Sequence, residues 1–335
     1  MIDSTLPLID LHRHLDGSVR LETILDLGRH YNVPLPAWDV EGLRPHVQIT
    51  GRESGVMAFI ARFKWMTGVL VTPEACRRIA YENAADARAE GIDYIELRFS
   101  PWFMAEPNAL APEAVVEAVI DGATAGARDF GIGVGLIGVL SRTYGPDTAR
   151  HELDALLAHR ERLVALDLAG DEVLWPAHHF AGHFRRARDA GLAVTVHAGE
   201  ADGPESIWQS LRDLGATRIG HAVRAMDDPT LMDYMAEHRI GIEANLTSNV
   251  QTSTVPDYAS HPLRHWLARG LLATINSDDP VISGIDLPYE YRVAAPAAGL
   301  TPAQIRQAQR NALEIVFLGP AARQALAAKK AASGA

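Results

Sequence analysis

Eight short apolar runs recur along the chain, each bounded by glycine or polar residues: Leu8–Leu11, Tyr94–Phe99, Val134–Leu140, Leu163–Leu168, Ala193–Val196, Arg218–His221, Gly241–Ala244 and Leu272–Ile275. The runs are apolar on both faces, as expected for parallel strands buried under helices. Most intervals between them carry helical periodicity. After the fourth run, for example, Phe180, Phe184 and Ala187 share one helical face before Gly191. This alternation predicts an α/β protein, either a barrel or a long doubly wound sheet.

The interval between the first two runs is longer, about 80 residues, and holds helical stretches near Leu21–Tyr31, Val56–Thr67 and Pro73–Glu90. A (β/α)8 TIM barrel takes about 250 residues and often carries insertions. The 335 residues therefore fit one barrel domain spanning 1–335, with a helical lid insertion after the first strand at about 20–90. The last ten residues, LAAKKAASGA, are expected to form a frayed tail.

The composition of the chain excludes several classes of protein. The formal net charge is −11, which argues against binding to nucleic acid or an anionic membrane, because both require clustered Lys and Arg. A single cysteine, Cys76, excludes a disulfide framework and a cysteine-based zinc site. No apolar stretch reaches the length of a membrane span, and no secretory leader is recognisable. A soluble, cytoplasmic protein is expected.

Polar residues with catalytic potential lie at the ends of the predicted strands. In a barrel, such residues converge at the carboxyl ends of the strands. His12 and His14 follow the first run, and a period of two places both imidazoles on one side of the strand. An H-x-H pair alone is equally consistent with two structural or surface histidines. Together with His197 and Asp278 it would form a three-His, one-Asp site suited to catalytic Zn²⁺. The same donors admit Fe²⁺, Co²⁺ or Mn²⁺.

Three further groups at the same strand ends are candidates for proton transfer and substrate contact. They are Glu200, His221 and Asp279. Each also has a purely structural interpretation: a carboxylate at a helix start for Glu200, a core histidine for His221, and a turn residue before Pro280 for Asp279. Gly170 follows the fourth run at the same edge. The convergence of all of them favours a catalytic centre.

Other histidines and the cysteine are expected to have structural positions. His179 with His183, and His261 with His265, have the i, i+4 spacing that could bind a metal on a helix. No third ligand accompanies either pair, so both are interpreted as solvated helix faces. Cys76 lies among apolar residues and is interpreted as a small buried hydrophobe.

Seven strings taken together resemble one family. They are DLHRHLDGS (10–18), ELRFSP (96–101), LDLAGDE (166–172), VHAGE (196–200), IGHA (219–222), LTSN (246–249) and NSDDP (276–280). In this order they resemble adenosine deaminases of the metal-dependent amidohydrolase superfamily, and the bacterial members most. The resemblance runs from about Leu6 to beyond Gln309. It implies a (β/α)8 barrel, in agreement with the eight runs.

The resemblance also implies roles for individual residues. One Zn²⁺ per chain would be held by His12, His14, His197 and Asp278. Glu200 would protonate purine N1, and His221 would deprotonate or orient the metal-bound water. Asp279 would hydrogen-bond to N7, the backbone N–H of Gly170 to N3, and Asp16, near His14, to the ribose 5′-hydroxyl. The implied reaction is attack of zinc-bound hydroxide on C6, which converts adenosine and 2′-deoxyadenosine to inosine and 2′-deoxyinosine plus ammonia in purine salvage.

Two departures and three alternatives accompany this assignment. Ala222 stands where many relatives have glycine, and Asn245 where relatives often have cysteine. Relatives specific for free adenine carry H-x-E-G, so the H-L-D-G context of Asp16 favours a nucleoside with a free 5′-hydroxyl. The alternatives are a deaminase of adenine or another aminopurine, a binuclear amidohydrolase, and a non-catalytic nucleoside-binding barrel. A binuclear enzyme usually has a bridging lysine at a middle strand end, and LDLAGDE has none.

Overall fold

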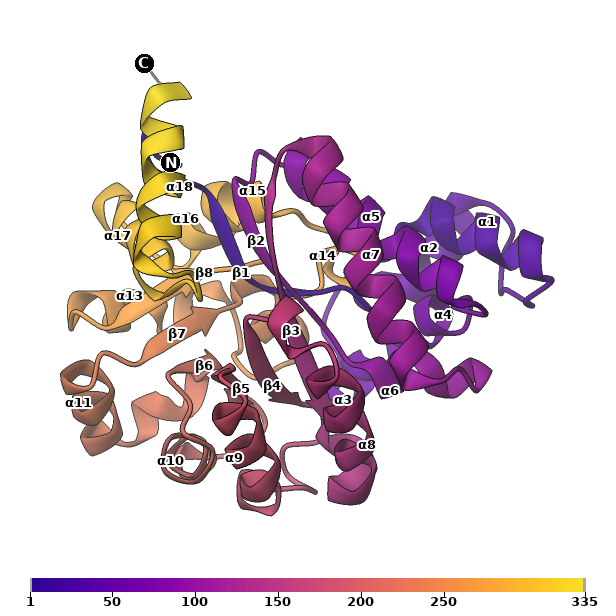
Figure 1. Ribbon diagram of the computed structural model, residues 1–335. Coiled ribbons are helices and arrows are strands. Elements are labelled where there is room, and N and C mark those ends of the chain that lie inside the picture. The colour runs from indigo at the N-terminus through magenta and orange to yellow at the C-terminus, as the bar shows by residue number, and fades with distance from the viewer. Residues whose placement is uncertain (1, 334–335) are drawn as a thin grey trace.

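A computed structural model describes residues 2–333. Eight parallel strands form one sheet in the order β1 to β8, surrounded by helices as a (β/α)8 barrel (Figure 1). The strands are β1 (Ile9–His14), β2 (Tyr94–Phe99), β3 (Gly133–Ser141), β4 (Ala165–Ala169), β5 (Ala193–Ala198), β6 (Arg218–His221), β7 (Gly241–Ala244) and β8 (Leu272–Ile275). β2, β6, β7 and β8 have the predicted bounds, and the barrel prediction is confirmed.

The first and last strands meet beside the candidate metal ligands. The backbone N–H of His14 donates to the carbonyl of Asp278 at 2.8 Å, and the N–H of Asp278 donates to the carbonyl of His12, also at 2.8 Å. Arg13 and Asp278 form an isolated parallel bridge at this point. The seam between the two ends of the sheet therefore contains three of the residues that the sequence marks as metal-binding.

Five α-helices lie between β1 and β2: α1 (Leu21–Tyr31), α2 (Val40–Val47), α3 (Val56–Ile60), α4 (Lys64–Thr67) and α5 (Pro73–Ala89). Helix α1 has the predicted bounds, whereas the predicted helix Val56–Thr67 is divided by a 3₁₀ turn at Ala61–Phe63. Helix α2 was not predicted. It contains Pro45 in its last turn, where proline disrupts the expected periodicity. In Figure 1, α1, α2 and α4 lie together at one side of the barrel.

The remaining helices follow the strands: α6 (Pro101–Ala105), α7 (Pro112–Phe130), α8 (Gly145–Leu157), α9 (Ala181–Asp189), α10 (Pro204–Gln209), α11 (Pro229–Glu237), α12 (Leu246–Gln251), α13 (Leu263–Ala268), α14 (Pro280–Ser283), α15 (Leu287–Tyr289), α16 (Ala295–Ala297), α17 (Pro302–Ile315) and α18 (Pro320–Ser333). Proline occupies the first turn of many of them, because it lacks the N–H that this position cannot use. Within residues 2–333, no helix is long and apolar enough to cross a membrane.

The expectation of a frayed tail is wrong for the residues that the structure describes. Helix α18 continues to Ser333, and residues 334–335 lie outside the described range. Alanine and lysine favour helix strongly. Leu326 packs against the apolar cluster of Ile9 and Leu11, and Lys330 forms an ion pair with Asp93 at 2.9 Å. These contacts hold the helix against the barrel.

Candidate active site

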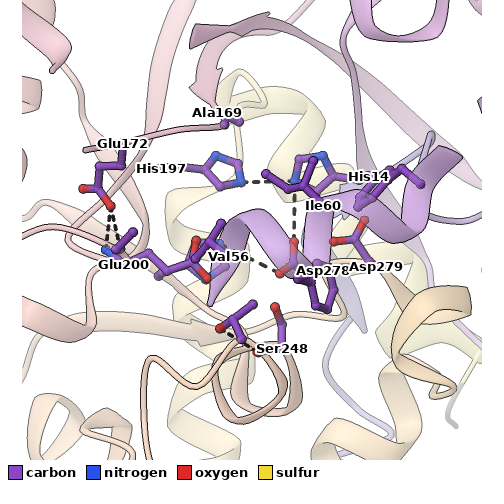
Figure 2. Close-up of a pocket in the computed structure, with 16 residues that line it drawn as sticks. His14, Val56, Ile60, Ala169, Glu172, His197, Glu200, Ser248, Asp278 and Asp279 are labelled. Atoms are coloured by element: carbon purple, nitrogen blue, oxygen red, sulfur yellow. Dashed lines mark hydrogen bonds and ion pairs between the residues drawn. The ribbon is translucent and has the colours of Figure 1, made fainter. Parts of the chain in front are cut away.

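A cavity lies at the carboxyl ends of the strands. Its wall includes His14, Gly170, His197, Glu200, His221, Asp278 and Asp279. Figure 2 shows Val56 and Ile60 on the helical segment that lies against this cavity. The strand ends therefore bring seven of the predicted site residues to one space, although they are spread from the first to the last strand.

A group of possible metal ligands includes three residues of this wall. One ligand atom each from His12, His197, His221 and Asp278 lie within 4.8 Å of one another, and all four residues are buried. Nε2 of His12 is 3.0 Å from Nε2 of His197 and 3.1 Å from Oδ1 of Asp278.

His14 joins the same group from the other side. Its Nε2 is 3.1 Å from Nε2 of His197 and 3.5 Å from Oδ1 of Asp278 (Figure 2). The two histidines of the H-x-H pair thus both reach His197 and Asp278. The structure brings all four predicted ligands together, and it places His221 within 4.8 Å of the ligand atoms of His12, His197 and Asp278.

Two buried carboxylates fix the protons of these imidazoles. Nδ1 of His12 donates to Oε2 of Glu243 at 2.7 Å, and Nδ1 of His197 donates to Oδ2 of Asp167 at 3.0 Å. The Nε2 atoms therefore carry lone pairs, and they face each other with no proton between them. This is the outer-shell arrangement that orients metal-binding histidines. The donor set consequently fits a divalent cation held by nitrogen and oxygen.

Arg98 links the two outer carboxylates. Its guanidinium donates to Asp167 at 2.8 Å and to Glu243 at 2.7 Å. Glu243 also accepts hydrogen bonds from Thr195 and Arg218, each at 2.7 Å. Glu243, Asp167 and Arg98 were missed in the sequence. Charged residues within otherwise apolar strands were the available signal, since buried charges occur almost only when they are paired.

Glu200 lines the cavity from a loop whose backbone is hydrogen-bonded to a second carboxylate, that of Glu172. Glu172 accepts hydrogen bonds from the backbone N–H groups of residues 199–202, including that of Glu200 at 3.1 Å (Figure 2). Burial, and then the charges of Asp278, Glu172 and Asp279, raise the pKa of Glu200 well above its usual value. Glu200 is thus suited to carry a proton at neutral pH.

Asp279 faces the cavity separately from Asp278. Asp278 has a left-handed φ of 60°, and this turn directs the two neighbouring carboxylates differently. Burial and the charge of Asp278 raise the pKa of Asp279, and its Oδ1 has no hydrogen-bond partner. A Cβ at Gly17 would lie 1.6 Å from that oxygen, so only glycine permits Asp279 to occupy this position.

A second chamber of about 500 Å³ adjoins the first. The two share His14, Ile60, Phe63, Ala169 and Gly170 in their walls. Asp16 lines the second chamber, and its buried Oδ1 has no hydrogen-bond partner. The two chambers thus share a wall, and Asp16 places a carboxylate oxygen in the second one, 3.7 Å from Nδ1 of His14.

Comparison with known proteins identifies the family. The family model described as adenosine deaminase matches residues 7–332. The chain belongs to the adenosine deaminase family. An adenosine deaminase of Vibrio cholerae serotype O1 is 58% identical over 334 residues, which cover 100% of both chains. One of Klebsiella pneumoniae is 59% identical over 326 residues, which cover 97% of this chain and 98% of the relative.

Solved structures of similar proteins share the fold across nearly the whole chain. An adenine deaminase from Arthrobacter aurescens is 26% identical, with a TM-score of 0.90, covering 98% of this chain and 99% of that chain. An amidohydrolase from Burkholderia ambifaria with bound Zn is also 26% identical, with a TM-score of 0.89. The match covers 98% of this chain and 91% of that chain.

The two residues that depart from the family pattern both lie next to His221. Ala222 is buried and has a φ of 54°. Nδ2 of Asn245 is 3.3 Å from Nδ1 of His221. Asn245 therefore adds an amide donor beside this imidazole.

The expectation of two solvated histidine pairs is wrong for His261. His261 precedes helix α13 instead of lying on its exposed face, and it is only 1% exposed. His179 and His265 are exposed and His183 is half-buried, with its Nε2 at 2.9 Å from the carbonyl of Pro146. The prediction that Cys76 is a small buried hydrophobe is confirmed.

Proposed function

We propose that this chain is a metal-dependent hydrolase that deaminates adenosine to inosine and ammonia, and that it also accepts 2′-deoxyadenosine, in purine salvage. The observation that carries the proposal is the placement of a buried proton carrier, Glu200, beside a nitrogen and oxygen donor set in one cavity. Full-length relatives at 58% identity that are named adenosine deaminase support the substrate.

The donor set is proposed to hold one Zn²⁺ through His12, His14, His197 and Asp278, although other divalent ions suit the same atoms. A divalent ion bound there would lower the pKa of water at the site and so supply a nucleophile at neutral pH. Glu243 and Asp167 orient His12 and His197 for this role. The Zn-containing amidohydrolase from Burkholderia ambifaria supports this assignment of the metal.

Glu200 is proposed to protonate N1 of the purine. Protonation makes C6 electrophilic, and the acid must therefore be neutral when substrate binds. Burial beside Glu172 and Asp278 raises the pKa of Glu200 and keeps the proton on it.

The remaining site residues are proposed to contact substrate or the reacting oxygen. The raised pKa of Asp279 suits donation of a hydrogen bond to N7. The backbone N–H of Gly170 would bind N3, and His221 would contact the reacting oxygen. Asp16 has a buried oxygen without a hydrogen-bond partner in the second chamber, and near His14 this oxygen would accept a hydrogen bond from the ribose 5′-hydroxyl. Its negative charge disfavours a 5′-phosphate.

Helices between about 20 and 90 are proposed to act as a lid within a single-domain enzyme. Val56, Phe59, Ile60 and Phe63 line the cavity. These apolar side chains would cover the purine and exclude water from it during the reaction.

Two alternatives, an adenine deaminase and a binuclear amidohydrolase, fit the structure less well. Free adenine is the substrate named for the similar Arthrobacter protein, but adenine would leave the second chamber and Asp16 without a partner. A binuclear site of this kind usually has a bridging lysine at a middle strand end. The chain has only Lys64, Lys329 and Lys330, which lie on α4 and α18.

The test is to follow purine ultraviolet absorbance with adenosine, 2′-deoxyadenosine, adenine and AMP, each with and without a chelator. We expect both nucleosides to be deaminated, and we expect the chelator to abolish this activity. Turnover of adenine or AMP without adenosine would overturn the proposed substrate. Metal analysis should return one ion per active chain, and two would revive the binuclear alternative. Metal binding without turnover of any purine would instead indicate a nucleoside-binding role.

A further inference from the structure

His261 is buried next to the candidate active site without lining its cavity. Its Nδ1 accepts a hydrogen bond from the backbone N–H of Leu263 at 3.1 Å. Burial lowers the pKa of His261 to about 3, so the ring is neutral at physiological pH. Because a backbone N–H can only donate, the single ring proton of His261 must lie on Nε2.

This proton fixes the orientation of Asn249. Nε2 of His261 is 3.2 Å from Oδ1 of Asn249, and the N–H donates to that oxygen. The amide nitrogen of Asn249 then points the other way, where it is 3.0 Å from Nδ1 of His221 and 3.4 Å from Oε1 of Glu200. Reversing the amide would place its NH₂ group against the N–H of His261, with two donors facing each other.

The amide nitrogen in turn determines which tautomer His221 adopts. Nδ1 of His221 faces Nδ2 of Asn249 at 3.0 Å. Nδ2 of Asn245 lies 3.3 Å from Nδ1 and 3.5 Å from Nε2 of His221, so Asn245 does not distinguish the two ring nitrogens. The oriented amide of Asn249 therefore makes Nδ1 the acceptor. Oε1 of Glu200 also lies 3.4 Å from Nδ1, but a proton on Nδ1 would oppose the NH₂ group of Asn249. A neutral His221 consequently carries its proton on Nε2, on the side where Oδ2 of Asp278 lies at 3.9 Å.

We propose that His261 and Asn249 are positioning residues that hold His221 as the Nε2–H tautomer, so that His221 presents a hydrogen-bond donor, not a base, to the reacting oxygen. The relay runs in one direction, from the backbone N–H of Leu263 through His261 and Asn249 to His221. This inference deepens the proposed function and rests on it for the identity of the reacting oxygen. The tautomer itself rests only on the hydrogen bonds.

The direct test is ¹⁵N NMR of histidine-labelled, metal-loaded enzyme, with His221 assigned by its substitution. Wild type should show a protonated Nε2 and an unprotonated Nδ1 for His221. His261→Phe removes the donor and should broaden or reverse this pattern. His261→Gln retains an N–H and should preserve it. His265→Gln, on the exposed turn of α13, is the matched control and should change nothing.

Kinetics provide the second readout. His261→Phe should lower kcat about tenfold or more, because a hydrogen-bond donor to the reacting oxygen contributes about 10²–10³-fold to kcat, with KM little changed. His261→Gln should recover most of the loss, which a merely structural role would not predict. A wild-type His221 protonated on Nδ1 would overturn the proposal, as would an unchanged spectrum and kcat in folded His261→Phe. The NMR result stands even if adenosine is not the substrate, so the two failures are distinguishable.

Discussion

The carboxylate of Glu172 holds the backbone of Glu200. Its Oε2 accepts the N–H of Glu200 at 3.1 Å, of Ala201 at 2.7 Å and of Asp202 at 3.1 Å, while Oε1 accepts the N–H of Gly199. One side chain from the loop after β4 thus satisfies four consecutive amides in the loop after β5. The position of the proposed proton donor is set by a residue that need not touch substrate.

Glu172→Gln tests this arrangement. A glutamine has one acceptor oxygen, so its NH₂ group would face the N–H of Gly199 if the oxygen kept the other three amides, and each buried amide left without a partner costs about 1–3 kcal/mol. We expect kcat for adenosine to fall at least tenfold, since about 1.4 kcal/mol corresponds to a tenfold rate change, with a smaller change in KM. Steady-state kinetics measure both. Glu237→Gln on the exposed surface of α11 is the control, and equal losses in both variants would refute the positioning role.

Glu200→Gln tests the proposed proton donor itself. The amide is close in shape but cannot supply a carboxylic acid proton, so turnover should fall about 10²–10⁴-fold. Metal content and the melting temperature should stay near those of wild type, because Glu200 is not a proposed ligand. Kinetics, metal analysis and calorimetry on one preparation separate these effects. Retention of more than a tenth of kcat would remove Glu200 from this role.

Glu243→Gln tests the outer shell of the proposed metal centre. Glu243 accepts from His12, Thr195 and Arg218 as well as Arg98. Loss of its charge should weaken metal binding about 10–100-fold and lower stability by about 3–5 kcal/mol, because buried arginines lose their partner. Competition with a chromophoric chelator measures the affinity. An unchanged metal affinity in a folded variant would show that metal binding by His12 does not depend on Glu243.

Glu152, which lies behind the wall of the second chamber, should make the free energy of unfolding depend on pH. It accepts hydrogen bonds from Oγ of Ser100 at 2.6 Å and the N–H of Ser141 at 2.8 Å, yet burial raises its pKa from 4.5 to about 7. Between these values the folded chain binds more protons than the unfolded chain. The free energy of unfolding should therefore decrease as pH rises from 4.5 to about 7.

The Glu152 contribution is of the order of 3 kcal/mol across that interval, from 1.36 kcal/mol per pKa unit. Denaturant unfolding of wild type and Glu152→Gln at pH 5 and pH 8 measures it. The variant should lose less stability between the two pH values than wild type does. An equal or greater loss in the variant would contradict the assignment.

The sequence predicted the barrel because buried parallel strands leave a continuous apolar pattern, which helices and turns interrupt. It also predicted which residues converge, since the carboxyl ends of barrel strands share one face. The roles of Glu243, Asp167 and Asn249 could not be predicted in this way. Each depends on which side chain faces which across the barrel. His261 shows the limit, because its spacing to His265 suggested an exposed helix face and only packing places it inside.

The seam between β1 and β8 has a consequence for how the protein is made. His12 and His14 leave the ribosome well before Asp278, which exchanges backbone hydrogen bonds with both. Nascent chains fold progressively as they emerge, but this seam cannot close until the last strand is released. A chain truncated before β8 would lack both the closing strand and a proposed metal ligand. Incomplete products of synthesis are therefore expected to be inactive and to lack a complete set of the proposed metal ligands.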